Sequence, residues 1–282
     1  MLTIQLKLDN TNLNSKIHKT LEILEKYKNW NGKYVLFSGG KDSLVCLDLA
    51  YRCWKDSFKV VYIEVTGNTH PKCNRYVYKV VNEYGLELIH LKYDRDFFDV
   101  LVELGYPSIL WSKSRWCLQR FKDRPMSEFS RNNTVNLTVG GIKQGDSYKR
   151  KKWISKHAIN GVVFSVQKRY YGRVQVYPVY DWNNEDIWNY IIENNLPLNP
   201  LYNKIGGAGN CVICPAMRKD EFIAIMQKCP ELFCKWKKAH EKLRRDFAEG
   251  KLRGMKVVFH RFNKWYELYC KTIAKIEHCY LF

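Results

Sequence analysis

The segment Ser38-Gly39-Gly40-Lys41-Asp42-Ser43 limits the folds open to this chain more than any other feature of its sequence. It follows the apolar residues 34–37, which predict a short strand, and it precedes residues 44–54, whose pattern is typical of a helix. Two glycines let the backbone turn tightly and approach a ligand without a clash. Amide groups at the start of a helix lack intrahelical partners and, with the helix dipole, form an anion site. The sequence therefore predicts a phosphate-binding loop between a strand and a helix.

The side chains of this loop suit a phosphate ligand. Ser38 and Ser43 add hydroxyl donors, and Lys41 adds a positive charge. Asp42 is expected either to hold Mg²⁺ or to orient the loop. The spacing of a Walker A loop is absent, so a different class of phosphate loop is expected. We take Lys41 and Asp42 as candidate catalytic residues.

Strand and helix patterns alternate along the chain, which predicts an α/β fold with a doubly wound parallel sheet. Further strands are expected at 59–65, 86–91, 134–139 and 174–179, and helices at 12–29, 71–84, from 181, and at 219–247. Ligands of such sheets bind outside the carboxyl ends of the strands. We expect a helical lead-in over residues 1–29, a nucleotide-binding domain over 30–215, and a basic, mostly helical C-terminal part over 216–282.

Charge is the second unusual feature. The chain has 47 lysines and arginines against 28 acidic residues, a net charge of +19, and 15% of its residues are aromatic. Basic residues interleaved with aromatic ones, as in residues 149–153 and 235–238, are typical of single-strand nucleic-acid binding, although a solvated basic surface is the simpler alternative. No apolar run is long enough to cross a bilayer and no signal peptide is visible, so a cytoplasmic protein without membrane partners is expected.

The ten cysteines do not indicate a disulfide framework, because the chain has no visible export signal. Cys211 and Cys214 form a CxxC pair in a glycine-rich loop. Two thiolates at this spacing can hold a metal ion or a cluster, act as a redox pair, or occur by chance.

Several segments of the chain, from about residue 30 to 235, resemble the PAPS reductase family of the PP-loop ATP pyrophosphatase superfamily, whose fold is the adenine nucleotide alpha-hydrolase-like, HUP-type fold. The similar segments, in order, are Ser38 to Ser43, Thr66-Gly67 with His70-Pro71, Arg115-Trp116-Cys117 with Lys122, Gly141 to Ser147 with Arg150, and Tyr177 to Trp182 with Pro197 to Tyr202. Lys143 replaces the usual arginine of the fourth motif, which weakens the expectation of a bidentate phosphate contact there.

The resemblance implies an adenine nucleotide, ATP or a sulfonucleotide, at the strand ends, with Mg²⁺ on its phosphates. The implied nucleotide-binding residues are Phe37, Ser38, Gly39, Gly40, Lys41, Asp42, Ser43, Val65, Thr66, Gly141, Lys143 and Arg150.

The resemblance also implies a 4Fe–4S cluster, because cluster-bearing APS reductases of this family join a Cys-Cys pair to a later CxxC. Here Trp116 stands at the first position, so Cys117, Cys211 and Cys214 match three ligands. Either Cys229 or Cys234 supplies the fourth, or one iron is open, as in some tRNA-thiolating relatives, and Cys117 then takes part in catalysis. A zinc site and metal-free thiols are the alternatives.

Three functions fit these patterns. The leading one is an ATP pyrophosphatase-type sulfurtransferase that cleaves ATP to AMP and pyrophosphate and activates tRNA or DNA, with a possible sulfur-donor protein. The second is a PAPS or APS reductase that releases sulfite, although the Glu-Cys-Gly-x-His tail of those enzymes is absent and Cys279 only partly matches it. The third is a nucleotide- or nucleic-acid-binding module without catalysis.

Overall fold

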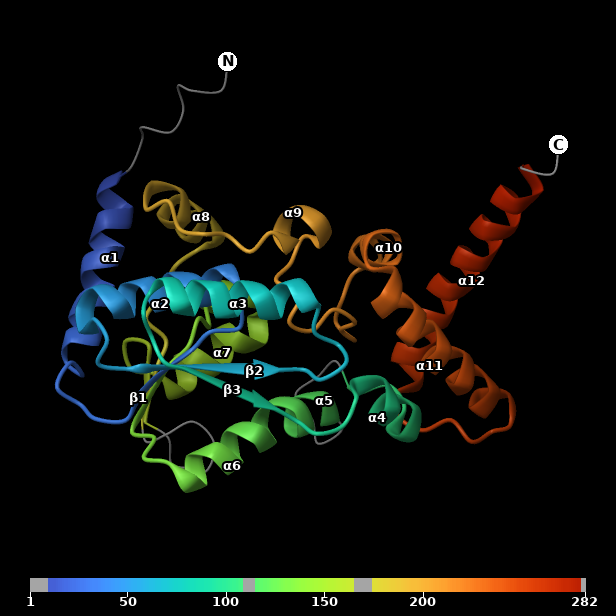
Figure 1. Ribbon diagram of the computed structural model, residues 1–282, viewed down its shortest axis with the longest axis horizontal. Coiled ribbons are helices and arrows are strands. Elements are labelled where there is room, and N and C mark those ends of the chain that lie inside the picture. Colours follow the sequence, from blue (N-terminus) through green and yellow to red (C-terminus); the bar gives the residue numbers. More distant parts are fainter. Residues whose placement is uncertain (1–9, 109–114, 165–173, 280–282) are drawn as a thin grey trace, which may run out of the picture.

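A six-stranded sheet organises the fold in the computed structural model, which describes residues 10–108, 115–164 and 174–279 (Figure 1). The strand order is β3-β2-β1-β4-β6-β5, and all neighbours are parallel except β5 and β6. The strands are β1 (Lys33–Leu36), β2 (Lys59–Glu64), β3 (Leu88–Lys92), β4 (Leu137–Val139), β5 (Val162–Phe164) and β6 (Val174–Val176). The predicted α/β class with a doubly wound sheet is confirmed, with one antiparallel edge strand added.

Helices surround this sheet and make up the C-terminal part. They are α1 (Asn10–Glu25), α2 (Lys41–Trp54), α3 (Pro71–Glu83), α4 (Phe97–Leu104), α5 (Trp116–Leu118), α6 (Arg124–Asn132), α7 (Tyr148–His157), α8 (Asn184–Glu193), α9 (Leu201–Ile205), α10 (Lys219–Lys228), α11 (Pro230–Ala248) and α12 (Lys256–Cys279). Two short helical turns, η1 (Gln119–Asp123) and η2 (Gln144–Asp146), precede α6 and α7. No helix in the described ranges has the length and apolar character that a membrane span requires.

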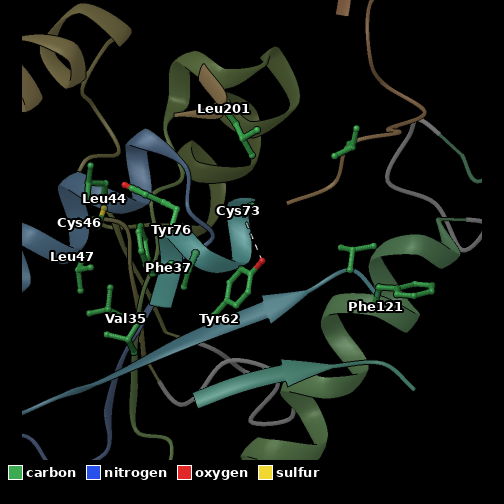
Figure 2. Packing of buried hydrophobic residues seen from close by; sticks show 14 of the residues in the cluster. Val35, Phe37, Leu44, Cys46, Leu47, Tyr62, Cys73, Tyr76, Phe121 and Leu201 are labelled. Carbon is green, nitrogen blue, oxygen red and sulfur yellow. Dashed lines mark hydrogen bonds between the residues drawn. The ribbon is translucent and has the colours of Figure 1, made fainter. Parts of the chain in front are cut away.

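Strand β1 separates two apolar layers because successive side chains point to opposite faces. Val35 and Phe37 join the large core with Leu44 and Leu47 of α2 (Figure 2). Tyr34 faces the other way and belongs to a smaller cluster with residues of α6. Figure 1 shows α2 and α3 on one side of the sheet and α6 on the other. This packing fixes the carboxyl end of β1, where the phosphate loop begins.

The C-terminal helices pack around aromatic rings. Phe222, Trp236 and Phe262 have ring centroids within 5.8 Å of one another. The ring of Tyr106, just after α4, stacks on Phe262 at 4.9 Å. These rings belong to the same continuous apolar core as β1 and α2. The C-terminal part is therefore anchored to the sheet rather than attached by a linker.

Several predicted boundaries were wrong, each for a physical reason. The helix after the phosphate loop begins at Lys41 rather than at residue 44, so half of the loop is already its first turn. The helix expected over 219–247 is two helices that meet at Cys229, because Pro230 begins α11 and cannot continue α10. The strand expected over 174–179 ends at Val176, where the chain turns toward α8.

Candidate functional site

The phosphate loop is a compact turn at the carboxyl end of β1. Gly39 has a φ of +77°, a backbone conformation that favours glycine. Gly40 is the N-cap of α2 and offers no side-chain cap. The Ser43 hydroxyl donates to the Gly40 carbonyl at 2.9 Å and accepts from the Ser38 amide at 3.3 Å. The loop is therefore closed by its own hydroxyl group at the start of α2, where helix amides lack intrahelical partners and can bind an anion.

Residues from 199 to 202 brace this loop from one side. The Asn199 side-chain amide donates to the Gly39 carbonyl at 3.0 Å. The Tyr202 hydroxyl accepts from the Lys41 amide at 2.8 Å, and burial raises the pKa of Tyr202 to about 12. These two side chains could not be assigned to the phosphate loop from the sequence, because about 160 positions separate them from it.

A series of ion pairs with alternating charges connects the loop to α7. The Lys41 ammonium contacts the Asp42 carboxylate at 2.8 Å, and the Lys143 ammonium binds the same oxygen. Lys143 also contacts Asp146 at 3.1 Å, and Arg150 binds the other oxygen of Asp146. Asp42 thus pairs with two lysines, and both roles expected for it, holding Mg²⁺ and orienting the loop, stay predictions.

The pKa of Lys143 reflects this position. The Lys143 side chain is only 2% exposed, and this burial lowers its pKa, but the hydrogen bond and charge of Asp42 outweigh burial and raise the pKa above its usual value. Burial acts in the opposite sense on Asp146, where the charges of Lys143 and Arg150 keep the pKa below its usual value. A buried, charged lysine next to a phosphate loop is a pre-placed counter-ion for an anion.

The backbone at Gly141, just after β4, lies directly against the backbone of the phosphate loop. A Cβ atom added to Gly141 would lie 2.8 Å from the carbonyl carbon of Asp42 and 2.8 Å from the amide nitrogen of Ser43. A side chain at this position would push β4 away from the start of α2. By contrast, a Cβ added to Gly145 would meet nothing within 4 Å. Glycine is therefore required at 141 for a reason that does not hold four residues later.

A cavity of about 770 Å³ opens in front of the loop and the ends of β1, β2 and β4. Seven of the residues expected to bind the nucleotide line it, namely Phe37, Ser38, Gly40, Asp42, Ser43, Gly141 and Arg150. The size matches that of small-molecule sites. The residues predicted from separate motifs thus share one cavity.

Five of the expected nucleotide-binding residues are not among the described residues that line this cavity. A Cβ atom added to Gly39 would lie 3.0 Å from the Cys73 sulfur on α3, so this glycine packs close to that helix. Lys41 and Lys143 direct their ammonium groups to Asp42. Val65 and Thr66 are occupied locally at the end of β2, where the Val65 amide donates to Thr69 and the Thr66 hydroxyl donates to a backbone carbonyl.

Four cationic side chains line the cavity, Arg150 among them, together with aromatic ones that were not singled out as site residues from the sequence. The cationic residues are Arg115, Lys122, Lys149 and Arg150, and the aromatic ones beside Phe37 are Trp153 and Tyr177. Two acidic residues, Asp42 and Asp123, are also present. The excess of positive charge around a cavity with aromatic walls suits a polyphosphate attached to a flat base.

The CxxC loop docks on the turn that follows β2. Asn68, which is fully buried, donates to the Ile213 carbonyl at 3.0 Å and accepts from the Ile213 amide at 2.8 Å. Its backbone carbonyl accepts from the Val212 amide at 2.9 Å. Asn210 in the same loop lines the cavity. The cysteines are therefore held at the border of the candidate nucleotide site.

The thiols of Cys211 and Cys214 share a hydrogen bond, which lowers the pKa of Cys214 to about 6, with further lowering by Arg115 and Lys122. The pKa of Cys211 is raised by the same hydrogen bond and by burial. Cys117 is close enough for its charge to act on Cys214, and burial raises the pKa of Cys117. Three of the four predicted metal ligands are therefore neighbours.

As placed, these thiols do not fit a metal centre. Within residues 10–108, 115–164 and 174–279, no three His, Cys, Asp or Glu residues form a group that could hold a metal ion. Cys229 is buried where α10 meets α11, and the charges that act on it come from Lys204 and Lys72. Every cysteine whose side chain is described has a free thiol. The cluster and the zinc site remain predictions from the sequence.

A family profile described as the phosphoadenosine phosphosulfate reductase domain matches residues 33–217. An uncharacterised protein of Methanocaldococcus jannaschii is 30% identical over 223 residues, which make up 77% of this chain and 51% of that protein. A second one from the same organism is 31% identical over 76% of this chain and 42% of its own length. The chain spans about half the length of these two relatives.

More distant relatives carry functional names. The sulfate adenylyltransferase subunit 2 of Agrobacterium fabrum is 24% identical, with coverage of 67% of this chain and 62% of that protein. The phosphoadenosine 5′-phosphosulfate reductase of Photorhabdus laumondii is 24% identical over 71% of this chain and 75% of its own. A crystal structure of phosphoadenylyl-sulfate reductase from Candida auris, in complex with phosphate, aligns with a TM-score of 0.48 and 19% identity over 70% of this chain and 92% of that one. Because the profile covers well over half of its length, the chain belongs to the phosphoadenosine phosphosulfate reductase domain family of the PP-loop superfamily.

Proposed function

We propose that this chain is an ATP pyrophosphatase-type sulfurtransferase that binds ATP in the cavity in front of the phosphate loop. An oxygen of a nucleic-acid acceptor attacks the α-phosphorus, the bond to the β-phosphate breaks, and pyrophosphate leaves. A sulfur nucleophile then attacks the adenylated carbon of the acceptor, and AMP leaves with the oxygen. The observation that carries this proposal is the shared cavity of the phosphate loop and four cationic side chains.

The residues of the chain contribute position and charge rather than covalent chemistry. The amides that begin α2 and the hydroxyls of Ser38 and Ser43 are placed to hold phosphate oxygens. Arg150 and Lys149 of α7 line the same cavity. Mg²⁺ on the nucleotide would neutralise further phosphate charge. Asp42 is engaged by two lysines, so we assign it the positioning of these ammonium groups.

The named relatives support an adenine nucleotide as ligand. One is named as an adenylyltransferase and the other as a reductase of a phosphoadenosine compound, so both names refer to an adenosine-containing substrate. The adenylyltransferase name agrees with attack at an α-phosphorus. The high positive charge of the chain agrees with a polyanionic acceptor.

Release of radiolabelled pyrophosphate from ATP tests this function, measured with and without bulk tRNA or denatured DNA. We expect release that depends on the acceptor and that falls by at least about a hundredfold in Lys41→Ala, because Lys41 offsets the charge of Asp42, a carboxylate that lines the cavity, and electrostatic effects of this kind supply several kcal/mol. A matched Lys55→Ala variant, just past the end of α2, keeps the wild-type rate. Absence of release with every acceptor, from protein that binds ATP, would count against the proposal.

A reductase is the second candidate, and the neighbouring thiols beside the cavity favour it. One cysteine thiolate would attack the sulfur of a bound sulfonucleotide and release the nucleotide, leaving a thiosulfonate on the enzyme. A second thiolate would attack that cysteine sulfur, forming a disulfide and releasing sulfite. Sulfite production from PAPS or APS that is lost in Cys214→Ser would select this reaction. Loss in Cys279→Ser would instead assign the step to the end of α12.

Metal analysis decides what the thiols hold. Protein purified without oxygen and carrying about four irons per chain would establish the cluster predicted from the sequence. Zinc at one per chain would establish the alternative site. Protein free of both metals would leave the thiols free and available for the reductase reaction.

A further inference from the structure

Helix α7 runs from the wall of the candidate nucleotide cavity onto the protein surface. Lys149, Arg150 and Trp153 line the cavity. Lys152 and Lys156 follow Lys149 at spacings of three and seven residues, so the three lysines lie along one side of the helix. A stripe of positive charge therefore leads away from the cavity over roughly 10 Å, at 1.5 Å of rise per residue.

Most of the charge on α7 is unpaired. Arg150 binds Asp146, but Lys149, Lys151, Lys152 and Lys156 have no carboxylate partner among the residues that the structure describes. Cations in the first turn of a helix also oppose its dipole, and like charges four residues apart repel each other. By these rules the arrangement costs stability in the free protein, and a bound polyanion would offset that cost.

Packing does not explain why the helix has this sequence. Ile154 is the one buried residue among the ten of α7. Tyr148, at the start of the helix, is 80% exposed, the largest exposed fraction among the large hydrophobic residues that the structure describes. An exposed aromatic ring next to a row of cations is the combination that holds single-stranded nucleic acid, with bases stacked on rings and phosphates on lysines.

We propose that α7 is the acceptor-binding surface, and that it holds the backbone of a single-stranded or looped RNA while one nucleotide enters the cavity. This inference rests on the proposed function, because the acceptor must reach an α-phosphorus inside a cavity of about 770 Å³. A base-paired nucleotide is held inside its duplex, so the acceptor nucleotide must be splayed out, as it is in RNA loops. Tyr148 stacks on a base that flanks it.

Fluorescence anisotropy with a labelled single-stranded RNA oligonucleotide tests the surface, over a series of KCl concentrations and without nucleotide. The test variant is Lys151→Gln/Lys152→Gln/Lys156→Gln. The control is Lys219→Gln/Lys228→Gln/Lys238→Gln, which removes the same charge from exposed positions on α10 and α11. We expect the α7 variant to bind RNA at least about tenfold more weakly and to lose about 2 from the salt slope, since each phosphate contact contributes about 0.7.

Tyr148→Ala provides an independent readout, because it changes no charge. It should weaken RNA binding about fivefold or more without a change in the salt slope. Equal RNA binding by the α7 and control variants would overturn the inference. So would equal affinity for a duplex of the same sequence, or full competition by polyglutamate of equal charge, which would indicate an acidic protein partner instead.

Binding of ATP, measured on the wild type, the α7 lysine variant and the control variant, separates this inference from the proposed function. The α7 lysines that are changed do not line the cavity, so ATP affinity should stay within about twofold of wild type. Normal ATP binding with unchanged RNA binding would refute the surface alone. Loss of RNA binding by the α7 variant, in a protein that never binds ATP, would refute the proposed function and leave the surface.

Discussion

Helices α7 and α11 are both rich in lysine, but the structure uses their charges differently. On α11, Lys235 contacts Asp96 at 3.2 Å, Lys237 contacts Glu241 at 3.9 Å, and Lys242 binds Asp246. Six residues of α11 are buried, against one of α7. On α7, Lys149 lines the candidate nucleotide cavity, and none of the four lysines has an acidic partner among the described residues.

The contrast shows that net charge does not locate a binding surface. Both helices contribute to the +19 of the chain, and both have a tryptophan among their lysines. Trp236 on α11 is fully buried and donates from Nε1 to the Tyr106 hydroxyl at 2.9 Å. Trp153 on α7 lines the cavity. The ion pairing of the lysines and the position of the tryptophan therefore distinguish a basic helix with a structural role from one that is available to a ligand.

The largest expected effect is on the free energy of unfolding, and it distinguishes the buried Trp236 of α11 from the exposed Tyr148 of α7. Trp236→Ala should lower the free energy of unfolding by about 3–5 kcal/mol, because it removes a fully buried ring from the C-terminal core. Tyr148→Ala on α7 should change it by no more than about 0.5 kcal/mol. Urea unfolding followed by circular dichroism measures both. Similar losses for the two variants would contradict the distinction between a packed and a ligand-facing helix.

The pH dependence of stability offers the next effect. Burial, with the charge of Arg244, lowers the pKa of His240 on α11 to about 3. The Tyr106 hydroxyl, which accepts from Trp236, donates to His240 Nδ1 at 3.0 Å, so the folded protein holds this histidine neutral. The unfolded chain binds a proton near pH 6.5, so stability falls as pH drops below that value.

Between pH 7.5 and pH 5, this one group should remove about 2 kcal/mol of stability. Urea unfolding at the two pH values measures the change, and His240→Phe should show a loss smaller by that amount. An identical loss in wild type and His240→Phe would mean that His240 titrates normally in the folded protein.

The smallest effect belongs to an exposed ion pair of α11. Lys235 and Asp96 have side chains that are 53% and 29% exposed, so a double-mutant cycle with Lys235→Gln and Asp96→Asn should give a coupling of about 0.2–1 kcal/mol. Asparagine retains the acceptor with which Asp96 caps α4. On α7, Lys152→Gln should leave stability within about 0.5 kcal/mol of wild type. A larger cost at Lys152 than at Lys235 would reverse the comparison.

Local patterns in the sequence predicted the parts of the fold that depend on local physics. The strand, glycine turn and helix around residues 34–54 follow from apolar spacing and the conformational freedom of glycine. Strand β5 was not predicted, because three residues at an antiparallel edge do not produce a readable period. Helix α4 was not predicted either, because its eight residues are apolar on nearly every side.

The site was predictable in its motifs but not in its assembly. Gly141 and the phosphate loop were recognised separately, and their contact was not expected from spacing. The brace from Asn199 and Tyr202, and the cavity wall from Lys149 and Trp153, depend on tertiary contacts between distant segments. A single sequence contains no signal of such contacts. Tyr202 was noted only as part of a segment similar to the family, and Lys149 only as part of a basic and aromatic segment.

The most direct test of the central claim is equilibrium dialysis of radiolabelled ATP against wild type, Gly141→Ala and Gly145→Ala. Only the first substitution places a carbon 2.8 Å from the backbone that begins α2, and the second meets open space. We predict about one bound ATP per chain for wild type and Gly145→Ala, and an affinity at least about tenfold lower for Gly141→Ala. No saturable ATP binding by wild type, or equal affinity in all three folded proteins, would contradict the account.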